Sequence, residues 1–242
     1  MKEINIVPLF NQSAPKVWDD FMRIRTTTRK ITYNIETTDT DFNATMAEFK
    51  ENWAKPYQNF AFAAYDNCDM IGFISGTYDI KTARIEHLYV LPQYQGQRIG
   101  KRLLNAAETA ISVDADTTDL ISMGTSDKFY EKYGYISETK TNHYKKSVKN
   151  SGHCQVVPVF RCMPTLINKF AKISGKQKQS FNRAELLKSR TPIFVYRDIN
   201  SNITGFGICG KNPEIYASSD WARKRIEKAI STYKMQLQTK YK

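Results

Sequence analysis

A short segment of the chain has the composition of a phosphate-binding turn. It reads Tyr94-Gln95-Gly96-Gln97-Arg98-Ile99-Gly100-Lys101 and joins a predicted strand to a predicted helix. Glycine lets a backbone approach a ligand closely. The first N–H groups of a helix are unpaired and lie at the positive end of its dipole. The segment therefore predicts a site for a diphosphate.

Other phosphate and metal motifs are absent. A P-loop needs four residues between its glycines and a Ser or Thr after its lysine, but only three residues separate Gly96 from Gly100, and Arg102 follows Lys101. The dinucleotide fingerprint Gly-x-Gly-x-x-Gly does not occur. The run of Asp114, Asp116 and Asp119 lacks the glycine and glutamate of a calcium loop, and the cysteines lack zinc spacing. We expect no metal, and free thiols.

Hydrophobic periodicity predicts the elements that position the segment. Strands are predicted over residues 3–10, 60–65, 70–77, 84–90 and 120–124 and from 136 onward, and helices over 15–25, 44–53, 99–111 and 127–132. Residues 26–43 form a polar stretch for which no helix or strand is predicted. Ser126 is expected to cap the short helix, and Gly134 to end it in the left-handed conformation. The order indicates a mixed α/β domain with a central sheet.

Two motifs of this region carry a resemblance. Leu88-Tyr89-Val90-Leu91-Pro92, followed by residues 95–100, resembles the GNAT acyltransferase superfamily, whose loop reads Gln/Arg-x-x-Gly-x-Gly/Ala. A second family signature is matched by Phe129-Tyr130-Glu131-Lys132-Tyr133-Gly134-Tyr135. Arg98 replaces the first glycine of the loop. The resemblance covers about residues 3–145 and implies an acyl-CoA N-acyltransferase fold, a twisted mixed sheet flanked by helices.

The resemblance also implies roles for particular residues. Acetyl-CoA would be the acetyl donor and CoA the product. The backbone of Leu88, Tyr89 and Val90 would pair with the pantetheine arm. The diphosphate would lie on the loop and helix start, and the residues expected to hold the cofactor there are Gln95, Gly96, Gln97, Arg98, Ile99, Gly100, Lys101 and Ser126. Tyr130 would border the cofactor and protonate the departing thiolate; alternatively it packs in the core.

Glu86 is the candidate base that accepts a proton from an amine. Strand alternation predicts Arg84, Glu86, Leu88 and Val90 on one face of the strand, and His87 on the other with Ile85 and Tyr89. The alternative for Glu86 is a surface carboxylate paired with Arg84 or a lysine. His87 is a weaker candidate because it is predicted on the opposite face.

Charge divides the chain in two. Residues 146–242 hold 19 Lys and Arg against 5 Asp and Glu, a net charge of +14, while residues 1–145 hold 17 against 19, a net charge of −2. We expect an acetyltransferase domain over 1–145 and a smaller basic α/β lobe over 146–242. The lobe repeats the start of the chain: Val7-Pro8-Leu9-Phe10 is matched by Val157-Pro158-Val159-Phe160. It lacks the glycine loop, so it is predicted to be a truncated, degenerate repeat that shapes the acceptor cleft.

The sequence thus predicts a cytoplasmic N-acetyltransferase that moves an acetyl group from acetyl-CoA directly to a primary amine. No stretch is long and apolar enough for a membrane helix, so no membrane partner is expected. The alternative is a regulatory protein of the same fold that binds nucleic acid through its basic lobe, since basic segments attract acidic partners.

Overall fold

The computed structural model describes residues 4–10, 15–54, 59–79, 81–138, 142–148, 155–160, 164–176, 181 and 191–240. The chain forms two compact units, residues 1–149 and 150–242. The division lies four residues after the predicted boundary at 145, because strand β7 (His143–Ser147) belongs to the sheet of the first unit.

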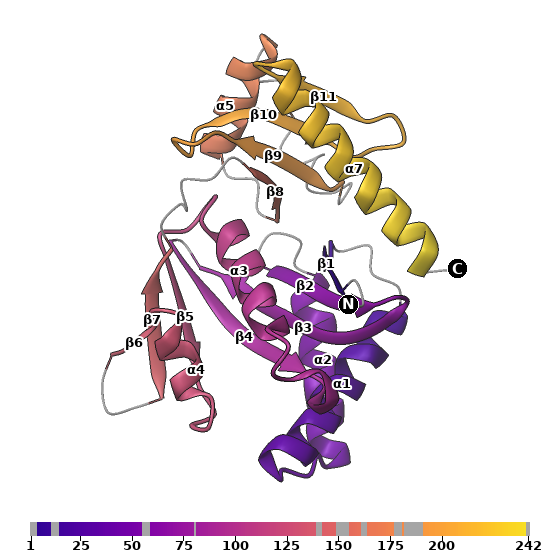
Figure 1. The fold of residues 1–242 in the computed structure, drawn as a ribbon, viewed down its shortest axis with the longest axis vertical. Helices are drawn as coiled ribbons and strands as arrows, with labels where there is room; N and C mark the ends of the chain where they lie inside the picture. The colour runs from indigo at the N-terminus through magenta and orange to yellow at the C-terminus, as the bar shows by residue number, and fades with distance from the viewer. Residues whose placement is uncertain are drawn as a thin grey trace. The chain divides into compact units, whose positions relative to one another are not determined.

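The first unit contains a seven-stranded mixed sheet (Figure 1), with the strand order β1-β2-β3-β4-β5-β7-β6. The strands are β1 (Ile4–Pro8), β2 (Asn59–Asp66), β3 (Asp69–Tyr78), β4 (Thr82–Val90), β5 (Thr117–Ile121), β6 (Ile136–Ser137) and β7. Only the pairing of β4 with β5 is parallel. The mixed α/β fold class predicted from the sequence is confirmed.

Helices cover both faces of this sheet. Helix α3 (Ile99–Ile111) lies on one face, and α1 (Pro15–Tyr33) and α2 (Asp39–Ala54) lie on the other (Figure 1). The core on the α1 side is aromatic: Phe21 stacks on Phe73 at 3.9 Å between ring centroids, and Phe49 meets both rings edge-on. Burial of such large apolar side chains is the main stabilising contribution.

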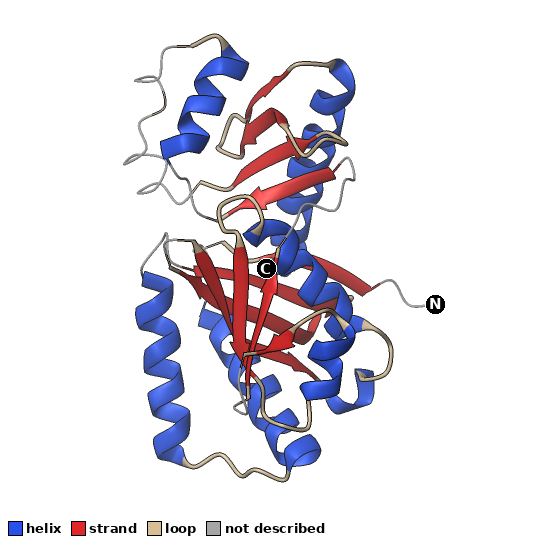
Figure 2. Cartoon of the chain, turned by 90° about the vertical axis from the view of Figure 1, so that its left-hand side faces the viewer, coloured by secondary structure: helices blue, strands red, loops and turns tan. Residues whose placement is uncertain are grey.

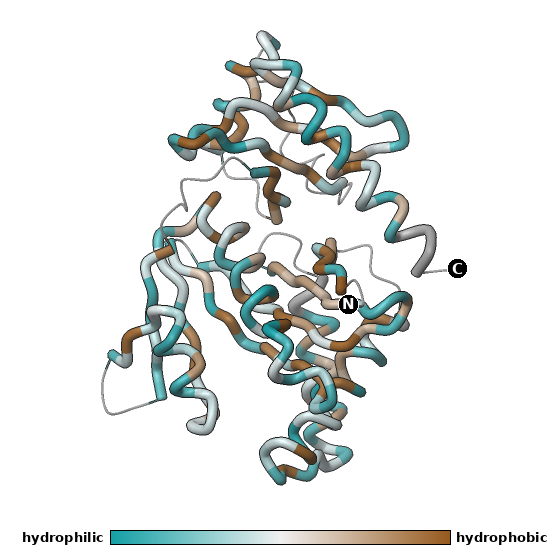
Figure 3. The backbone as a smooth tube through the Cα atoms, viewed as in Figure 1, coloured by the Kyte–Doolittle hydropathy of each residue, from teal (hydrophilic) through white to brown (hydrophobic). Residues whose placement is uncertain are grey.

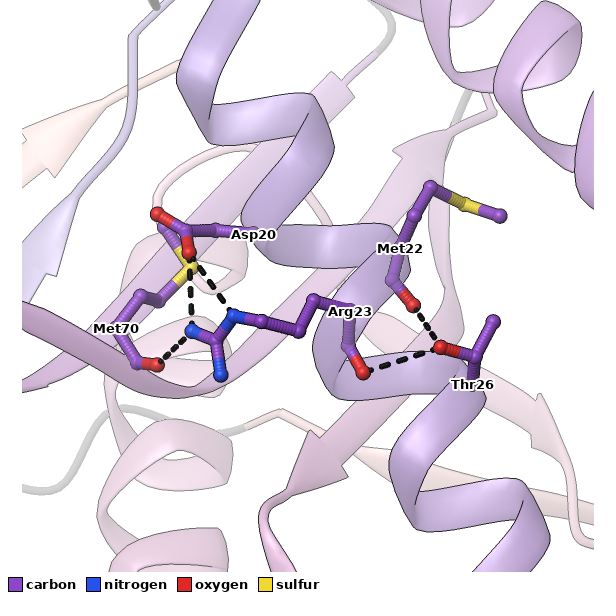
Figure 4. A network of polar contacts seen from close by, with 5 residues as sticks. All are labelled: Asp20, Met22, Arg23, Thr26 and Met70. Carbon is purple, nitrogen blue, oxygen red and sulfur yellow. Dashed lines mark hydrogen bonds and ion pairs between the residues drawn. The ribbon is translucent and has the colours of Figure 1, made fainter.

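Helix α1 extends eight residues beyond its predicted end at Arg25, into the polar stretch of residues 26–43. The hydroxyl of Thr26 donates to the carbonyl of Met22 at 2.8 Å, a bond that holds this polar segment within the helix (Figure 4). One turn earlier, Arg23 donates to Asp20 at 2.9 Å and to the carbonyl of Met70 at 2.8 Å, which ties α1 to β3. The helix therefore reaches the end of β4.

The second unit contains a four-stranded antiparallel sheet in the order β11-β10-β9-β8. Its strands are β8 (Gln155–Val159), β9 (Ile193–Arg197), β10 (Ile203–Ile208) and β11 (Glu214–Ala217), and its described helices are α5 (Pro164–Ser174) and α7 (Asp220–Lys240) (Figure 2). In Figure 3 apolar segments follow the strands of both units, whereas α7 is largely hydrophilic.

The second unit repeats the arrangement of the first half of the other. Strands β8 to β11 follow the neighbour order of β1 to β4, and α5 and α7 occupy the chain positions of α1 and α3. Phe170 stacks on Phe206 at 4.1 Å, as Phe21 does on Phe73, and Phe181 meets both rings edge-on. In each unit the strand partner of the stacked β-strand phenylalanine is a tyrosine, Tyr89 or Tyr216.

Two further predictions concern the cysteines and the absence of a membrane helix. Cys68 and Cys209 are free thiols, while Cys154 and Cys162 lie outside the described residues. None of the described helices has the length and apolar composition needed to cross a bilayer.

Candidate functional site

The second half of β4 has an open edge. β4 pairs with β5 only from Thr82 to Ile85, and the two strands then separate, as Figure 1 shows. Successive residues of a strand point their N–H and C=O groups to opposite edges. Leu91 donates its N–H to Ile71 of β3. Leu88 and Val90 therefore point their backbone groups to the open edge, whereas Tyr89 points its groups to β3.

Gln95 joins the end of β4 to α1. Its side-chain amide donates to the carbonyl of Val90 at 3.0 Å and to the hydroxyl of Thr32 at 3.2 Å. The hydroxyl of Thr28 donates to the same carbonyl at 3.2 Å. The Val90 carbonyl was predicted to pair with a ligand, but it already accepts hydrogen bonds from the protein. Gln95 therefore positions the loop. The backbone groups of Leu88 are the ones on this edge that remain available to a ligand.

The loop before α3 has a conformation that favours glycine. Gly96 has φ +77°, and a Cβ there would meet no atom within 4 Å. Arg98 has φ +62° and is the N-cap residue of α3, with no side-chain cap hydrogen bond. Arg98 thus adopts the left-handed conformation that the family's glycine would adopt without strain. The structure therefore accommodates Arg98 at this position in the left-handed conformation.

The N-terminus of α3 presents bare donors. Its first helical hydrogen bond runs from Arg102 to the carbonyl of Arg98, so the N–H groups of Ile99, Gly100 and Lys101 precede it. Within the described residues these three groups have no hydrogen-bond partner. They lie at the positive end of the helix dipole, beside the cationic side chains of Arg98 and Lys101. An anionic group fits this position.

A cavity of about 550 Å³ connects the open edge, the loop and the helix start. Most of the residues predicted from the sequence line it: Leu88, Val90, Gln95, Gly96, Arg98, Ile99, Gly100, Lys101, Ser126 and Tyr130. Tyr89, Gln97 and Glu86 do not. The sequence analysis missed the lining residues Thr28, Thr32, Tyr33, Tyr94, Thr125, Phe129, Lys132 and Tyr133. The three from α1 were missed because the predicted helix ended at residue 25, although Thr28 and Thr32 have helical spacing.

Tyr130 forms part of the cavity wall from α4 (Asp127–Lys132). Its ring packs edge-on against Phe129 and Tyr135, and only 8% of its surface is exposed. Burial raises the pKa of the Tyr130 phenol above its ordinary value, and the nearby phenols of Tyr33 and Tyr89 add to the effect. The phenol therefore stays protonated at neutral pH and can act as a donor.

Ser126 does not cap α4 as predicted, since its side chain makes no cap hydrogen bond. Its hydroxyl instead lies 3.1 Å from the hydroxyl of Tyr33, the last residue of α1. This contact closes the cavity between α1 and α4. Gly134 follows α4 with φ +83°, the left-handed conformation predicted for it.

The predicted alternation of β4 is wrong at Glu86. Ser75 pairs with His87 and Gly76 with Ile85, so Glu86 is an extra residue, a β-bulge. The bulge brings Glu86 and His87 together: their side-chain ligand atoms and that of Glu48 on α2 all lie within 4.8 Å of one another. Arg84 forms its ion pair with Asp119 rather than with Glu86.

The electrostatics of the two bulge residues differ. Partial burial raises the pKa of Glu86, the hydrogen bond from Thr77 at 2.9 Å opposes this, and Glu48 adds to it. Burial lowers the pKa of His87 to about 4, with a further contribution from the charge of Arg25. At neutral pH Glu86 is thus an anion of raised basicity and His87 is a neutral imidazole.

Residues 28–149 match the family model described as the acetyltransferase (GNAT) domain. The chain belongs to the GNAT acetyltransferase family.

Solved structures show the same fold. PaiA N-acetyltransferase from Thermoplasma acidophilum, solved in complex with coenzyme A, is 19% identical over 60% of this chain and 99% of its own, with a TM-score of 0.50. A GNAT-family acetyltransferase from Staphylococcus aureus Mu50 is 17% identical over 61% of this chain and 100% of its own, with a TM-score of 0.50. No curated protein matches the sequence.

Proposed function

We propose that this protein is an N-acetyltransferase that moves an acetyl group from acetyl-CoA directly to a primary amine. The observation that carries the proposal is the cavity, because it joins an open strand edge, bare helix donors and a buried phenol. The T. acidophilum relative was solved with coenzyme A, which supports a ligand of this type.

The residues present fit coenzyme A at this cavity. The N–H groups of Ile99, Gly100 and Lys101, with the side chains of Arg98 and Lys101, would hold the diphosphate. The free space over Gly96 lets the backbone come close to the ligand. The edge of β4 at Leu88 would accept the amide-bearing arm, much as a strand is added to a sheet.

Acetyl-CoA supplies the acetyl group as a thioester, whose carbonyl carbon the amine attacks as the C–N bond forms and the C–S bond breaks. Glu86 accepts the proton that the amine loses, directly or through a water, and its raised pKa suits this role. Tyr130 holds a proton for the sulfur of the leaving thiolate. Because the attack is direct, no residue of the chain becomes acetylated.

Calorimetric titration with CoA and with acetyl-CoA tests the ligand. We expect a dissociation constant near ~1 μM, about −8 kcal/mol, and loss of binding in Gly100→Glu, where the new carboxylate would repel the diphosphate. Gly210→Glu in the second unit is the matched control and should bind normally. If the wild type binds neither compound, the proposal fails, and the alternative, a protein that binds nucleic acid through the basic unit, would be tested by salt-dependent RNA binding.

We propose, further, that the second unit is a truncated, degenerate repeat without a cofactor site. The shared strand order and stacked phenylalanines support the duplication. The N-terminus of α7, the counterpart of α3, lacks a glycine, and the hydroxyl of Ser219 accepts a hydrogen bond from the N–H of Ala222 at 3.2 Å. Since this end of α7 is capped, the same titration should give one bound CoA per chain; two would contradict the idea.

A further inference from the structure

Two arginines of α1 have donors without partners. Arg25 is only 8% exposed, yet its Nε and Nη1 atoms are buried with no hydrogen-bond partner. One turn further along, the buried Nε of Arg29 also lacks a partner. Within the described residues neither guanidinium forms an ion pair.

This arrangement is unusual for buried cations. A buried charge is normally paired, and an unmatched buried donor destabilises the fold. Arg25 has one phenol contact, with Tyr89, and it repels Arg29. Asp41, an exposed residue of α2, is the acidic residue that acts on Arg25 electrostatically. Two positive charges, those of Arg25 and Arg29, thus lie one turn apart on α1, and no anion is paired with either among the described residues.

The arginines lie beside the residues that would handle the acceptor amine. Arg25 acts electrostatically on His87 and contacts Tyr89, both on the half of β4 that follows the bulge. Glu86 and Glu48 lie within 4.8 Å of the His87 ring nitrogen. The two carboxylates, which suit an amine, and the unmatched guanidinium group of Arg25 therefore act on the same imidazole, that of His87.

We propose that the acceptor carries a carboxylate close to its reacting amine, as in an amino acid, and that Arg25 and Arg29 bind this carboxylate. The inference rests on the proposed function. Guanidinium groups donate charge-assisted hydrogen bonds to carboxylates, and here three buried donors, two on Arg25 and one on Arg29, have no partner. Arg29 is half-buried, so an anion reaches it first, and Arg25 completes the contact.

The test compares acceptors that differ only in the carboxylate. Acetyl transfer is measured for a panel of amino acids and for their C-terminal amides, over a pH range so that the different amine pKa does not decide the ratio. We expect kcat/KM to be about 10 to 100 times higher for the amino acids, as for other buried charge-assisted hydrogen bonds. This comparison needs only the wild-type protein.

Variants assign the preference to the two arginines. Arg25→Met and Arg29→Met should each reduce the ratio toward one, mainly through KM, and Arg25→Lys should restore it in part. Lys30→Met removes an exposed positive charge from the same helix and should keep the wild-type ratio. Arg29→Met serves as the test if Arg25→Met does not fold.

The outcomes separate the two proposals. Equal transfer to amino acids and amides would overturn the carboxylate inference and leave the acetyltransferase standing. A preference that survives both Met substitutions would likewise overturn it. Transfer to no amine by a protein that binds acetyl-CoA would overturn the proposed function and this inference with it.

Discussion

At the scale of single residues, Arg98 shows a compromise between strain and charge. A non-glycine residue in the left-handed conformation costs roughly 1 kcal/mol. Arg98 adopts this conformation at φ +62°. Its positively charged side chain belongs to the cavity wall, beside the N–H groups at the start of α3. The residue therefore weakens the fold slightly and strengthens the attraction for an anion.

Arg98→Gly should separate these two effects. We expect the free energy of unfolding to rise by about 1 kcal/mol as strain is relieved, and CoA binding to weaken by about tenfold as a charge-assisted contact is lost. Arg98→Ala keeps the strain and loses only the charge, so it should weaken binding without stabilising the fold. Thermal unfolding and calorimetry measure both quantities. Equal stability of the Gly and Ala variants would contradict the strain.

Tyr130→Phe should slow turnover. Removal of the phenolic O–H that would donate the proton is expected to lower kcat by about 100-fold, while CoA affinity stays within about twofold. Tyr133→Phe is the control, because it also removes a phenol from the cavity wall. Steady-state kinetics with calorimetry gives both numbers. An unchanged kcat would reassign Tyr130 to core packing.

Glu86 should set the acidic limb of the pH profile. A carboxyl with a raised pKa remains protonated, and unable to accept a proton, to higher pH than an ordinary carboxyl near ~4.3. Log kcat/KM should therefore rise with pH through the raised pKa and then level off. Glu86→Gln should remove this limb and lower the plateau. Glu48→Gln should shift the limb to lower pH, since it removes a repelling charge. A profile that is identical in wild type and Glu86→Gln would exclude Glu86 as the base.

At the scale of elements, the bulge in β4 decides which side chains meet. Gly76 of β3 lies opposite the bulge, and a Cβ there would come within 2.0 Å of the Arg84 carbonyl oxygen and 2.6 Å of the Phe60 ring. The glycine lets the strands approach closely where the register shifts. The meeting of Glu86 with His87 thus depends on a residue of the neighbouring strand.

Gly76→Ala should therefore destabilise the first unit. Because the backbone of two strands must move, we expect a loss of about 2 to 3 kcal/mol in the free energy of unfolding by urea. Gly210→Ala is the control, since its Cβ would meet its nearest atom at 3.7 Å. If the two variants were equally stable, the close approach at Gly76 would not be required by the fold.

The sequence predicted some of these elements and not others. Ile99–Ile111 was placed correctly because its apolar face repeats with helical spacing, and the hairpin of β2 and β3 because two apolar runs flank a polar turn. The far end of α1 is rich in Thr and charge and carries no such pattern. The start of α2 did have a signal: the hydroxyl of Thr38 accepts the N–H of Asp41, a cap three residues apart. The bulge depends on contacts between strands, which strand alternation cannot show.

The candidate site, like the fold, was predicted from the sequence only in part. Motif residues of the loop and α4 line the cavity, because a local motif fixes a local shape. The residues contributed by α1 became visible only in the folded chain. The unpaired donors of Arg25 and Arg29 could not have been found in the sequence, since a missing partner is a property of packing.

At the scale of the whole molecule, each of the two units contains its own aromatic cluster, and the two clusters are arranged in the same way. Phe73 in the first unit and Phe206 in the second are both 0% exposed and stack on a helical phenylalanine. The helix that follows the hairpin strands begins without a side-chain cap in the first unit, whereas in the second unit Ser219 caps it at Ala222. The aromatic core and the start of this helix therefore vary independently between the two units.

Equivalent substitutions in the two cores should have different consequences. Phe73→Ala and Phe206→Ala should each destabilise their own unit by about 3 to 5 kcal/mol. We expect Phe73→Ala to weaken CoA binding as well, because Phe73 packs on Tyr89 of β4. Phe206→Ala should leave CoA affinity unchanged. Thermal unfolding and calorimetry on both variants give the comparison, and loss of CoA binding in Phe206→Ala would show that the second unit supports the site.

The separation of β4 from β5 has a consequence for the folding of the first unit. Only four residue pairs join β1–β4 to the remaining strands. We therefore expect β5 to β7 with α4 to unfold locally as one cooperative segment, at a lower free-energy cost than the rest of the first unit. A ligand lying along Leu88 and against Tyr130 would bridge the two parts. The resistance of this segment to local unfolding then rises with ligand concentration. The rate at which proteases degrade the protein would therefore depend on the concentration of its substrate.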